Sequence, residues 1–141
     1  MRLISLSILF ILLMTSCAKR PAYPEAPVSG ETITIDIKTL KEETPVFYSM
    51  RHKGKIIVFF VVKIKGEAQS YFDACARCYP EKLGYRVDGQ YVICRKCDIR
   101  YSMESLKAGF GSCYPIALRG KTEGGKYLID KKTVMEGEKL F

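Results

Sequence analysis

Two pairs of cysteines with identical spacing constrain the fold of this chain more than any other feature. The pairs are Cys75-Ala-Arg-Cys78 and Cys94-Arg-Lys-Cys97, and fifteen residues separate them. Each C-x2-C pair fits one tight turn that aims both sulfurs at a common point, and a loop of hairpin size between the pairs can bring the two turns together. The pattern predicts one tetrathiolate site for a metal ion or an iron–sulfur centre, with all four cysteines as ligands.

A fifth cysteine, Cys113, follows in the sequence Gly-Ser-Cys-Tyr-Pro. Three roles are open for it: an additional ligand, one half of a disulfide, or a buried thiol near the site; we favour proximity without ligation.

We predict no catalytic residue, because the single histidine, His52, lies in a basic, turn-like segment and is expected to be exposed. Covalent haem is not supported either, since Tyr79 and Asp98 follow the two cysteine pairs where histidine would be needed.

The start of the chain resembles a bacterial lipoprotein signal. Met1 and Arg2 precede an apolar run over residues 3–14, and a small-residue segment then ends at Cys17. The alternative is an uncleaved membrane helix, but the apolar run has twelve residues, whereas a spanning helix needs about 20. The resemblance implies removal of the signal peptide 1–16, lipid attachment at Cys17 and an extracytoplasmic, membrane-anchored location.

Residues 17–30 are expected to form a tether, because Pro21, Pro24 and Pro27 interrupt them and they show no apolar periodicity. The folded part then covers residues 31–141, a length typical of one domain. The formal net charge of the chain is +8. A basic surface would suit anionic lipid or an acidic redox partner, and nucleic acid is not an expected partner outside the cytoplasm.

The folded part shows the hydrophobic pattern of β strands and predicts an all-β, antiparallel domain. Strands are expected over residues 32–37, 45–50, 56–64, 68–73, 91–93, 99–102, 127–129 and 133–135. The one helical stretch expected is short and covers residues 103–108, with Ser102 as its N-cap and Gly109 beyond its end.

Charged and aromatic residues gather around the cysteine pairs. Basic residues exceed acidic ones between Cys75 and Arg100, which would balance the negative charge of a tetrathiolate centre. Six of the nine tyrosines lie between residues 71 and 114. We expect these tyrosines mainly to fill the sheet, and secondarily to shield the centre from water.

A family resemblance rests on motifs that surround both pairs. These motifs are Phe72-Asp-Ala-Cys75, Gly84-Tyr85, Arg100-Tyr101 and Gly111-Ser-Cys113-Tyr-Pro115-Ile-Ala-Leu118. Through them, residues 56–120 resemble the FtrD-like family of membrane-associated iron–sulfur proteins. The resemblance implies an electron carrier more than an enzyme, linked in some bacteria to oxidative uptake of ferrous iron alongside a membrane permease and copper-binding partners.

A more distant resemblance concerns architecture. Two loops that each follow a strand and carry two ligands, and then a Gly/Pro loop, are similar in order to Rieske domains, with Cys78 and Cys97 at the places of the two histidines. The fold class implied is a small Rieske-like antiparallel β domain. Its pair of C-x2-C knuckles would be similar to those of rubredoxin or a zinc ribbon.

Three functions stay open at this point. The first is an iron–sulfur electron carrier that works with a redox protein or a membrane permease. The second is a zinc ribbon that serves as a structural or binding module, which the cysteine spacing alone favours. The third is an exported domain whose cysteines pair as disulfides, because exported thiols pair unless a metal holds them. The family resemblance favours the iron–sulfur cluster.

Overall fold

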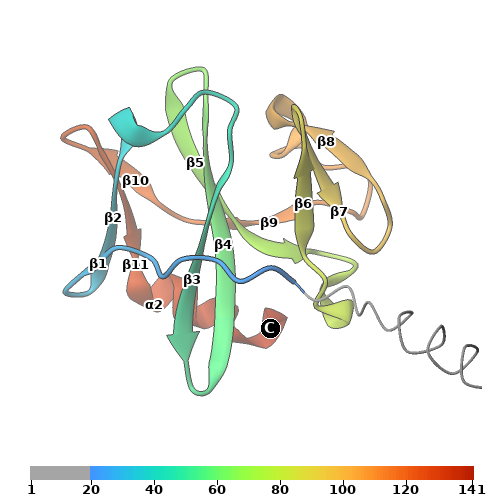
Figure 1. Cartoon of the computed structure of the whole chain (residues 1–141), viewed down its shortest axis with the longest axis horizontal. Coiled ribbons are helices and arrows are strands. Elements are labelled where there is room, and N and C mark those ends of the chain that lie inside the picture. The colour runs from blue at the N-terminus through green and yellow to red at the C-terminus, as the bar shows by residue number, and fades with distance from the viewer. Residues whose placement is uncertain (1–19) are drawn as a thin grey trace, which may run out of the picture.

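The structure is a computed structural model that describes residues 20–141. Their eleven strands form three antiparallel sheets, which confirms the all-β, antiparallel fold class (Figure 1). The expected signal peptide 1–16 and Cys17, the expected site of lipid attachment, lie outside the described residues.

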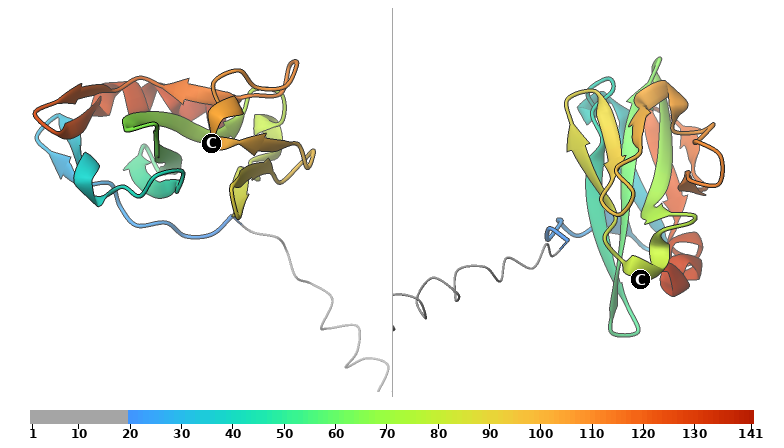
Figure 2. Two further views of the ribbon diagram at one scale, coloured as in Figure 1. Left: turned by 90° about the horizontal axis from the view of Figure 1, so that it is seen from above. Right: turned by 90° about the vertical axis from the view of Figure 1, so that its right-hand side faces the viewer.

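The three sheets are built from strands that mostly follow one another in sequence. The first sheet has the order β1 (Val28–Ser29), β2 (Thr32–Asp36), β11 (Lys126–Asp130) and β10 (Lys121–Glu123). The central sheet has the order β3 (Val46–His52), β4 (Lys55–Ile64), β5 (Glu67–Cys75) and β9 (Pro115–Leu118). The third sheet consists of β6 (Tyr85–Asp88), β7 (Tyr91–Cys94) and β8 (Arg100–Ser102), and forms a lobe beside the central sheet (Figures 1 and 2).

The central strand β4 explains why the sheets pack as they do. Phe59 and Val61 belong to a hydrophobic cluster shared with the first sheet, while Phe60 and Val62 belong to a second cluster shared with the third sheet. All four side chains are fully buried. Because successive side chains of a strand point to opposite faces, a continuous apolar run can fill two cores at once, and the third sheet is thereby held against the central one.

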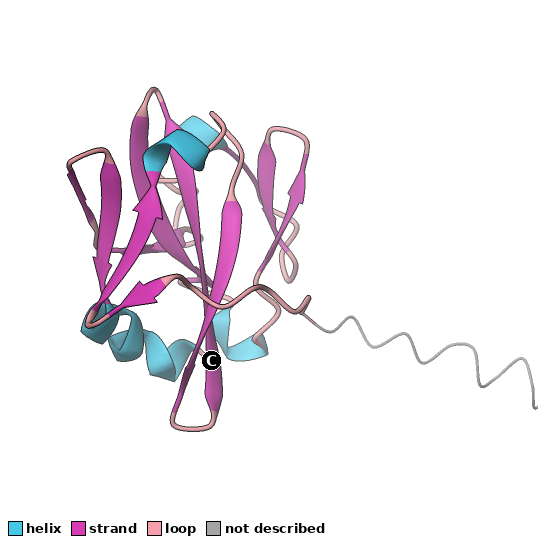
Figure 3. Cartoon of the chain, turned by 60° about the vertical axis from the view of Figure 1, so that its left-hand side comes forward, coloured by secondary structure: helices cyan, strands magenta, loops and turns pink. Residues whose placement is uncertain are grey.

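The helical elements differ from the sequence expectation. The strand expected at residues 133–135 is wrong, since these residues lie in α2 (Lys131–Glu136), next to the β3–β4 end of the molecule (Figure 3). The Asp130 side chain caps α2 by accepting a hydrogen bond of 2.7 Å from the Lys132 backbone N–H. The helix expected over residues 103–108 is only a 3-10 turn, η4 (Met103–Ser105).

Residues 20–30, expected as part of a tether, pack on the domain. The Tyr23 ring stacks on Phe47 with 4.7 Å between centroids, and Ser49 exchanges backbone hydrogen bonds with this segment, to Ala26 (2.8 Å) and Pro24 (2.7 Å). The prolines keep the segment extended, but its carbonyl groups find partners on the edge of β3. The segment from Tyr23 to Ala26 therefore lies along the edge of β3.

Candidate metal centre

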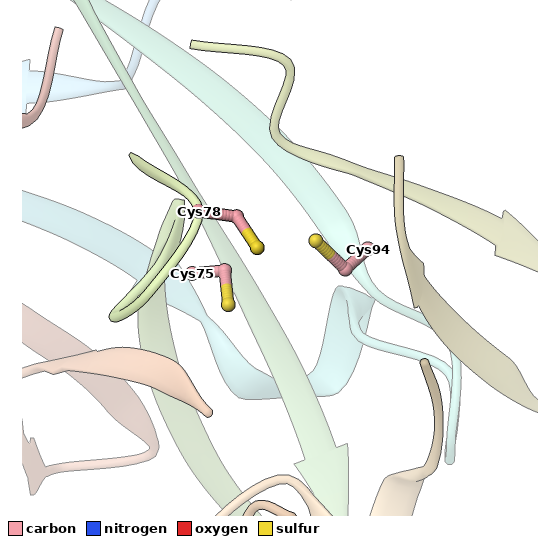
Figure 4. Close-up of side chains that lie close together, drawn as sticks. All are labelled: Cys75, Cys78 and Cys94. Atoms are coloured by element: carbon pink, nitrogen blue, oxygen red, sulfur yellow. The ribbon is translucent and has the colours of Figure 1, made fainter. Parts of the chain in front are cut away.

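Five cysteine sulfurs gather where the central sheet meets the third sheet. The sulfurs of Cys75, Cys78 and Cys94 all lie within 4.8 Å of one another (Figure 4), and so do those of Cys78, Cys97 and Cys113. The two groups share Cys78, and all five side chains are free thiols. The structure thus brings the four ligands predicted from the sequence together, and it adds Cys113 to the same site.

The two C-x2-C turns have the same backbone construction. In each turn, the backbone N–H groups two and three residues after the first cysteine donate hydrogen bonds to its sulfur, at Cys75 and at Cys94. Hydrogen-bond donors aimed at sulfur stabilise a thiolate. Both turns therefore favour the ionised form of their first cysteine, which is the form that binds metal. The equivalence of the turns explains why the spacing of the cysteines alone could locate the site.

Neither turn uses glycine after its second cysteine. Asp98 follows Cys97 and adopts a left-handed backbone conformation with φ of 56°, a region that glycine enters freely and aspartate tolerates better than most residues. Tyr79 follows Cys78 and instead begins the 3-10 turn η3 (Tyr79–Glu81). The backbone therefore continues differently after the two pairs, although their first cysteines are held in the same way.

An irregular pairing of β5 brings Cys113 to the site. The register of β5 with β9 shifts between Tyr71, which pairs with Ala117, and Cys75, which pairs with Pro115. The loop before β9 consequently lies against the Cys75 turn, and the Ala76 N–H donates to the Tyr114 carbonyl oxygen at 2.9 Å. Bulges of this kind re-aim side chains beside functional sites, and the sequence offers no direct signal for it.

The sulfurs differ in exposure. Cys75, Cys94 and Cys113 are buried, Cys78 is part-buried and Cys97 is exposed. The site is therefore enclosed by protein on most sides and reaches solvent at Cys97.

The thiol groups are also different in acidity. Burial disfavours the Cys75 thiolate, but the N–H groups of its own turn, together with the Tyr85 hydroxyl and the Cys78 thiol, outweigh that effect and lower the pKa of Cys75. Burial raises the pKa of the Cys94 thiol to about 11. Burial, reinforced by the neighbouring sulfurs, also raises the pKa of Cys78 and of Cys113. Several thiolates this close together would repel one another, so they can ionise together only when a cation compensates their charge. A metal ion provides that charge when it binds and displaces the thiol protons.

Two buried tyrosine hydroxyl groups face the same sulfurs. Tyr85 and Tyr101 are almost fully buried, and neither hydroxyl has a hydrogen-bond partner within residues 20–141. Burial raises the pKa of both phenols, so both keep their protons. The Tyr85 hydroxyl lies beside the Cys75 sulfur and can donate to it. Thiol ligands surrounded by hydrogen-bond donors fit an iron–sulfur centre.

A buried carboxyl group, that of Asp73, positions Tyr85 through its backbone. Asp73 is fully buried on β5, and its Oδ1 accepts a hydrogen bond of 2.6 Å from the Tyr85 N–H. Arg20 lies 3.3 Å from Asp73 Oδ2 and donates to the Asp73 carbonyl oxygen at 3.1 Å. Burial raises the pKa of Asp73 to about 7, and Arg20 opposes that rise. A Cβ on Gly84 would collide with the Asp73 carboxylate, which explains the glycine before Tyr85.

The basic residues around the pairs contribute less than the sequence suggests. Three of them form exposed ion pairs with the nearby acids, namely Lys96–Glu81 (3.3 Å), Arg86–Asp98 (3.4 Å) and Arg100–Asp88 (3.4 Å). Exposed pairs of this kind contribute little. The lowered pKa of Cys75 comes instead from the N–H groups of its own turn, and to a smaller extent from the Tyr85 hydroxyl and the Cys78 thiol. His52, expected to be exposed, is part-buried at the end of β3, with its Nε2 3.5 Å from Glu138 Oε2.

A small all-β domain with clustered cysteines at one site defines the class of the protein as a metal-binding domain. A family model described as "Membrane iron-sulfur containing protein FtrD-like" matches residues 40–141, well over half of the chain. The chain belongs to the FtrD-like family, which confirms the resemblance seen in residues 56–120 and extends it to both sides. No curated protein matches the chain. Within residues 20–141, none of the helices has the length and apolar character needed to span a membrane.

Proposed function

We propose that this protein is a membrane-anchored electron carrier in which Cys75, Cys78, Cys94 and Cys97 hold an iron–sulfur cluster. The observation that carries the proposal is the convergence of five thiols from three separate loops in a member of an iron–sulfur family. Such a cluster, when bound, supplies one-electron redox chemistry. The protein residues hold it, exclude water and set its potential.

The exposure of the cysteines supports a carrier more than an enzyme. Cys97 is the solvent-facing side of the site, while Cys75 and Cys94 are buried. One accessible edge on an otherwise enclosed site lets an electron pass to a docked partner without admitting water to the buried ligands. The described residues hold no acid–base or nucleophilic group at the site beyond the thiols and the two tyrosine hydroxyls, so the chain's own role is to hold and tune the centre.

The anchor and the physiological role complete the proposal. Cleavage before Cys17 and acylation of that residue would hold the protein at the extracytoplasmic side of a membrane, where more than one acyl chain gives stable attachment. The family resemblance supports a role in oxidising ferrous iron for uptake, with a redox protein or a membrane permease as partner. Mass spectrometry of the N-terminus of protein extracted from membranes tests the anchor.

Zinc is the second candidate, because the C-x2-C spacing favours it. A zinc site would make the domain a structural or binding module with no redox activity. Disulfide pairing is the third alternative; the five thiols are free in this structure.

A redox titration with electron paramagnetic resonance detection tests the electron-carrier function. Purified full-length protein is expected to take up one electron reversibly and to give a paramagnetic reduced state. The Cys94→Ser variant serves as the control and should lose that signal. A protein that shows no reducible centre although its cysteines are intact would overturn the proposal in favour of zinc.

A further inference from the structure

A cavity of about 680 Å³ lies directly behind the turn that carries Cys75 and Cys78. Ala76, the residue between those two ligands, forms part of its wall, and so do Tyr79 at the end of the same turn and Tyr114, the residue after Cys113. The opposite wall comes from β9 and from the segment α2–η5, where η5 covers Gly137–Leu140. The volume falls in the range of small-molecule sites.

Two half-exposed aromatic rings border this cavity. Tyr79 is 37% exposed and Tyr114 is 45% exposed. The small residues Ala76, Ala117 and Gly137 line the same cavity. Exposed rings at the border of a cavity suit a flat aromatic ligand, because stacking buries their free faces.

Two cations line the same cavity without a carboxylate partner. Arg119 and Lys139 form no ion pair within residues 20–141, in contrast to the paired bases near the cysteines. One acidic residue, Glu136, also lines the cavity, so the lining groups are net positive. Glu136 can accept a hydrogen bond from a ligand N–H, whereas the guanidinium and ammonium groups favour an anionic end.

We propose that this cavity, which we call the β9–α2 pocket, binds a planar aromatic molecule that carries a phosphate or carboxylate group. The ring stacks against Tyr79 and Tyr114, and the acidic group binds Arg119 and Lys139. The pocket is separate from the cysteine site but shares the wall formed by Ala76. The proposal concerns binding only, so it stands whether the cysteines hold an iron–sulfur cluster or zinc.

Fluorescence titration with flavin mononucleotide tests the pocket, because the free flavin is fluorescent and stacking on tyrosine quenches it. Riboflavin, which has the same ring but no phosphate, is the comparison ligand. We expect full-length protein to bind flavin mononucleotide at least about tenfold more tightly than riboflavin, as charge-assisted hydrogen bonds to phosphate provide. Inorganic phosphate at millimolar concentration should compete with flavin mononucleotide.

Three variants locate the binding. Arg119→Gln should lower the affinity for flavin mononucleotide to about that for riboflavin and leave riboflavin binding unchanged. Tyr114→Leu should weaken the binding of both ligands. Lys121→Gln removes an exposed lysine that pairs with Glu123 at 2.8 Å, outside the pocket, and should change neither affinity.

The outcomes separate the proposal from its alternatives. Equal affinity for the two flavins, or no quenching of either at millimolar concentration, would overturn it. If phosphate competes but Tyr114→Leu binds flavin mononucleotide as tightly as the unmodified protein, the pocket binds only the anionic group and not the ring. That result would also overturn the proposal. Iron content measured on the same preparations distinguishes failure of this proposal from failure of the iron–sulfur assignment.

Discussion

Cys78 belongs to both groups of close sulfurs, so it is the residue whose loss should affect the centre most. Removing a group that merely hydrogen-bonds to a ligand already lowers metal affinity about 10–100-fold, and Cys78 lies within 4.8 Å of four other thiols. We predict that Cys78→Ser lowers the affinity for iron at least about tenfold, the lower end of that range, so the purified variant should contain less iron per chain than the unmodified protein. Cys113→Ser should retain its iron. Metal analysis of both purified variants checks this, and equal loss from Cys113→Ser would show that Cys113 is also a ligand.

The hydroxyl of Tyr85 should raise the reduction potential of the centre. A hydroxyl that donates to the Cys75 sulfur once the centre is bound would stabilise the additional negative charge of the reduced state, and a net hydrogen bond of about 1 kcal/mol corresponds to about 40 mV for one electron. Tyr85→Phe should therefore lower the potential by about that amount. Tyr91→Phe is the matched control, because Tyr91 is 42% exposed on β7. Identical potentials in Tyr85→Phe and the unmodified protein would exclude this hydrogen bond.

At the scale of elements, Arg20 fastens the N-terminal segment to the strand that carries Cys75. Its guanidinium group reaches the buried Asp73 and lies 4.8 Å from the ring centroid of Phe141. Removing one partner of a buried pair costs about 3–5 kcal/mol when the other group stays charged. Without Arg20 the pKa of Asp73, about 7 in its presence, rises further and the carboxyl takes up a proton near neutral pH. We therefore predict that Arg20→Ala destabilises the protein by about 1–3 kcal/mol at neutral pH in denaturant unfolding, and by more as the pH rises and Asp73 ionises.

Arg51→Ala provides the control for Arg20→Ala. Arg51 lies 3.3 Å from Glu25, but both side chains are more than two-thirds exposed, so its loss should cost less than about 1 kcal/mol. The combination of Arg20→Ala with Asp73→Asn should recover part of the lost stability, because it removes the unpaired charge. Equal effects of the two arginine substitutions would contradict the assignment of a buried pair.

Whether a strand or helix could be predicted from the sequence depends on how its side chains are buried. The strand expected at 56–64 is β4, which is found because its apolar residues fill both cores. The strand β10 was missed because all three of its residues are exposed and give no hydrophobic pattern. Residues 133–135 were misread because Thr-Val-Met has strand propensity, while the cap from Asp130 decides in favour of a helix.

In the cysteine site too, features set by local sequence could be predicted and features set by tertiary contacts could not. Four of its sulfurs were located from spacing, since each pair needs only a local turn. The pair formed by Arg20 and Asp73 joins residues 53 positions apart, and no local pattern in the sequence indicates such a contact. The position of Cys113 also depends on the shifted register of β5, which is a tertiary feature.

At the scale of the whole molecule, the three sheets hold the cysteine site at a junction. The first and central sheets form the larger core, and the third sheet contributes Cys94 and the buried Tyr85 and Tyr101. The N-terminal segment reaches the same region through Arg20, which lies 3.3 Å from Asp73 Oδ2.

The iron and acid-labile sulfide content of full-length protein, purified without added metal, tests the central claim most directly. The account predicts a coloured protein that contains iron and sulfide in equal amounts and loses both in Cys78→Ser. A colourless protein that contains zinc and no sulfide would contradict it.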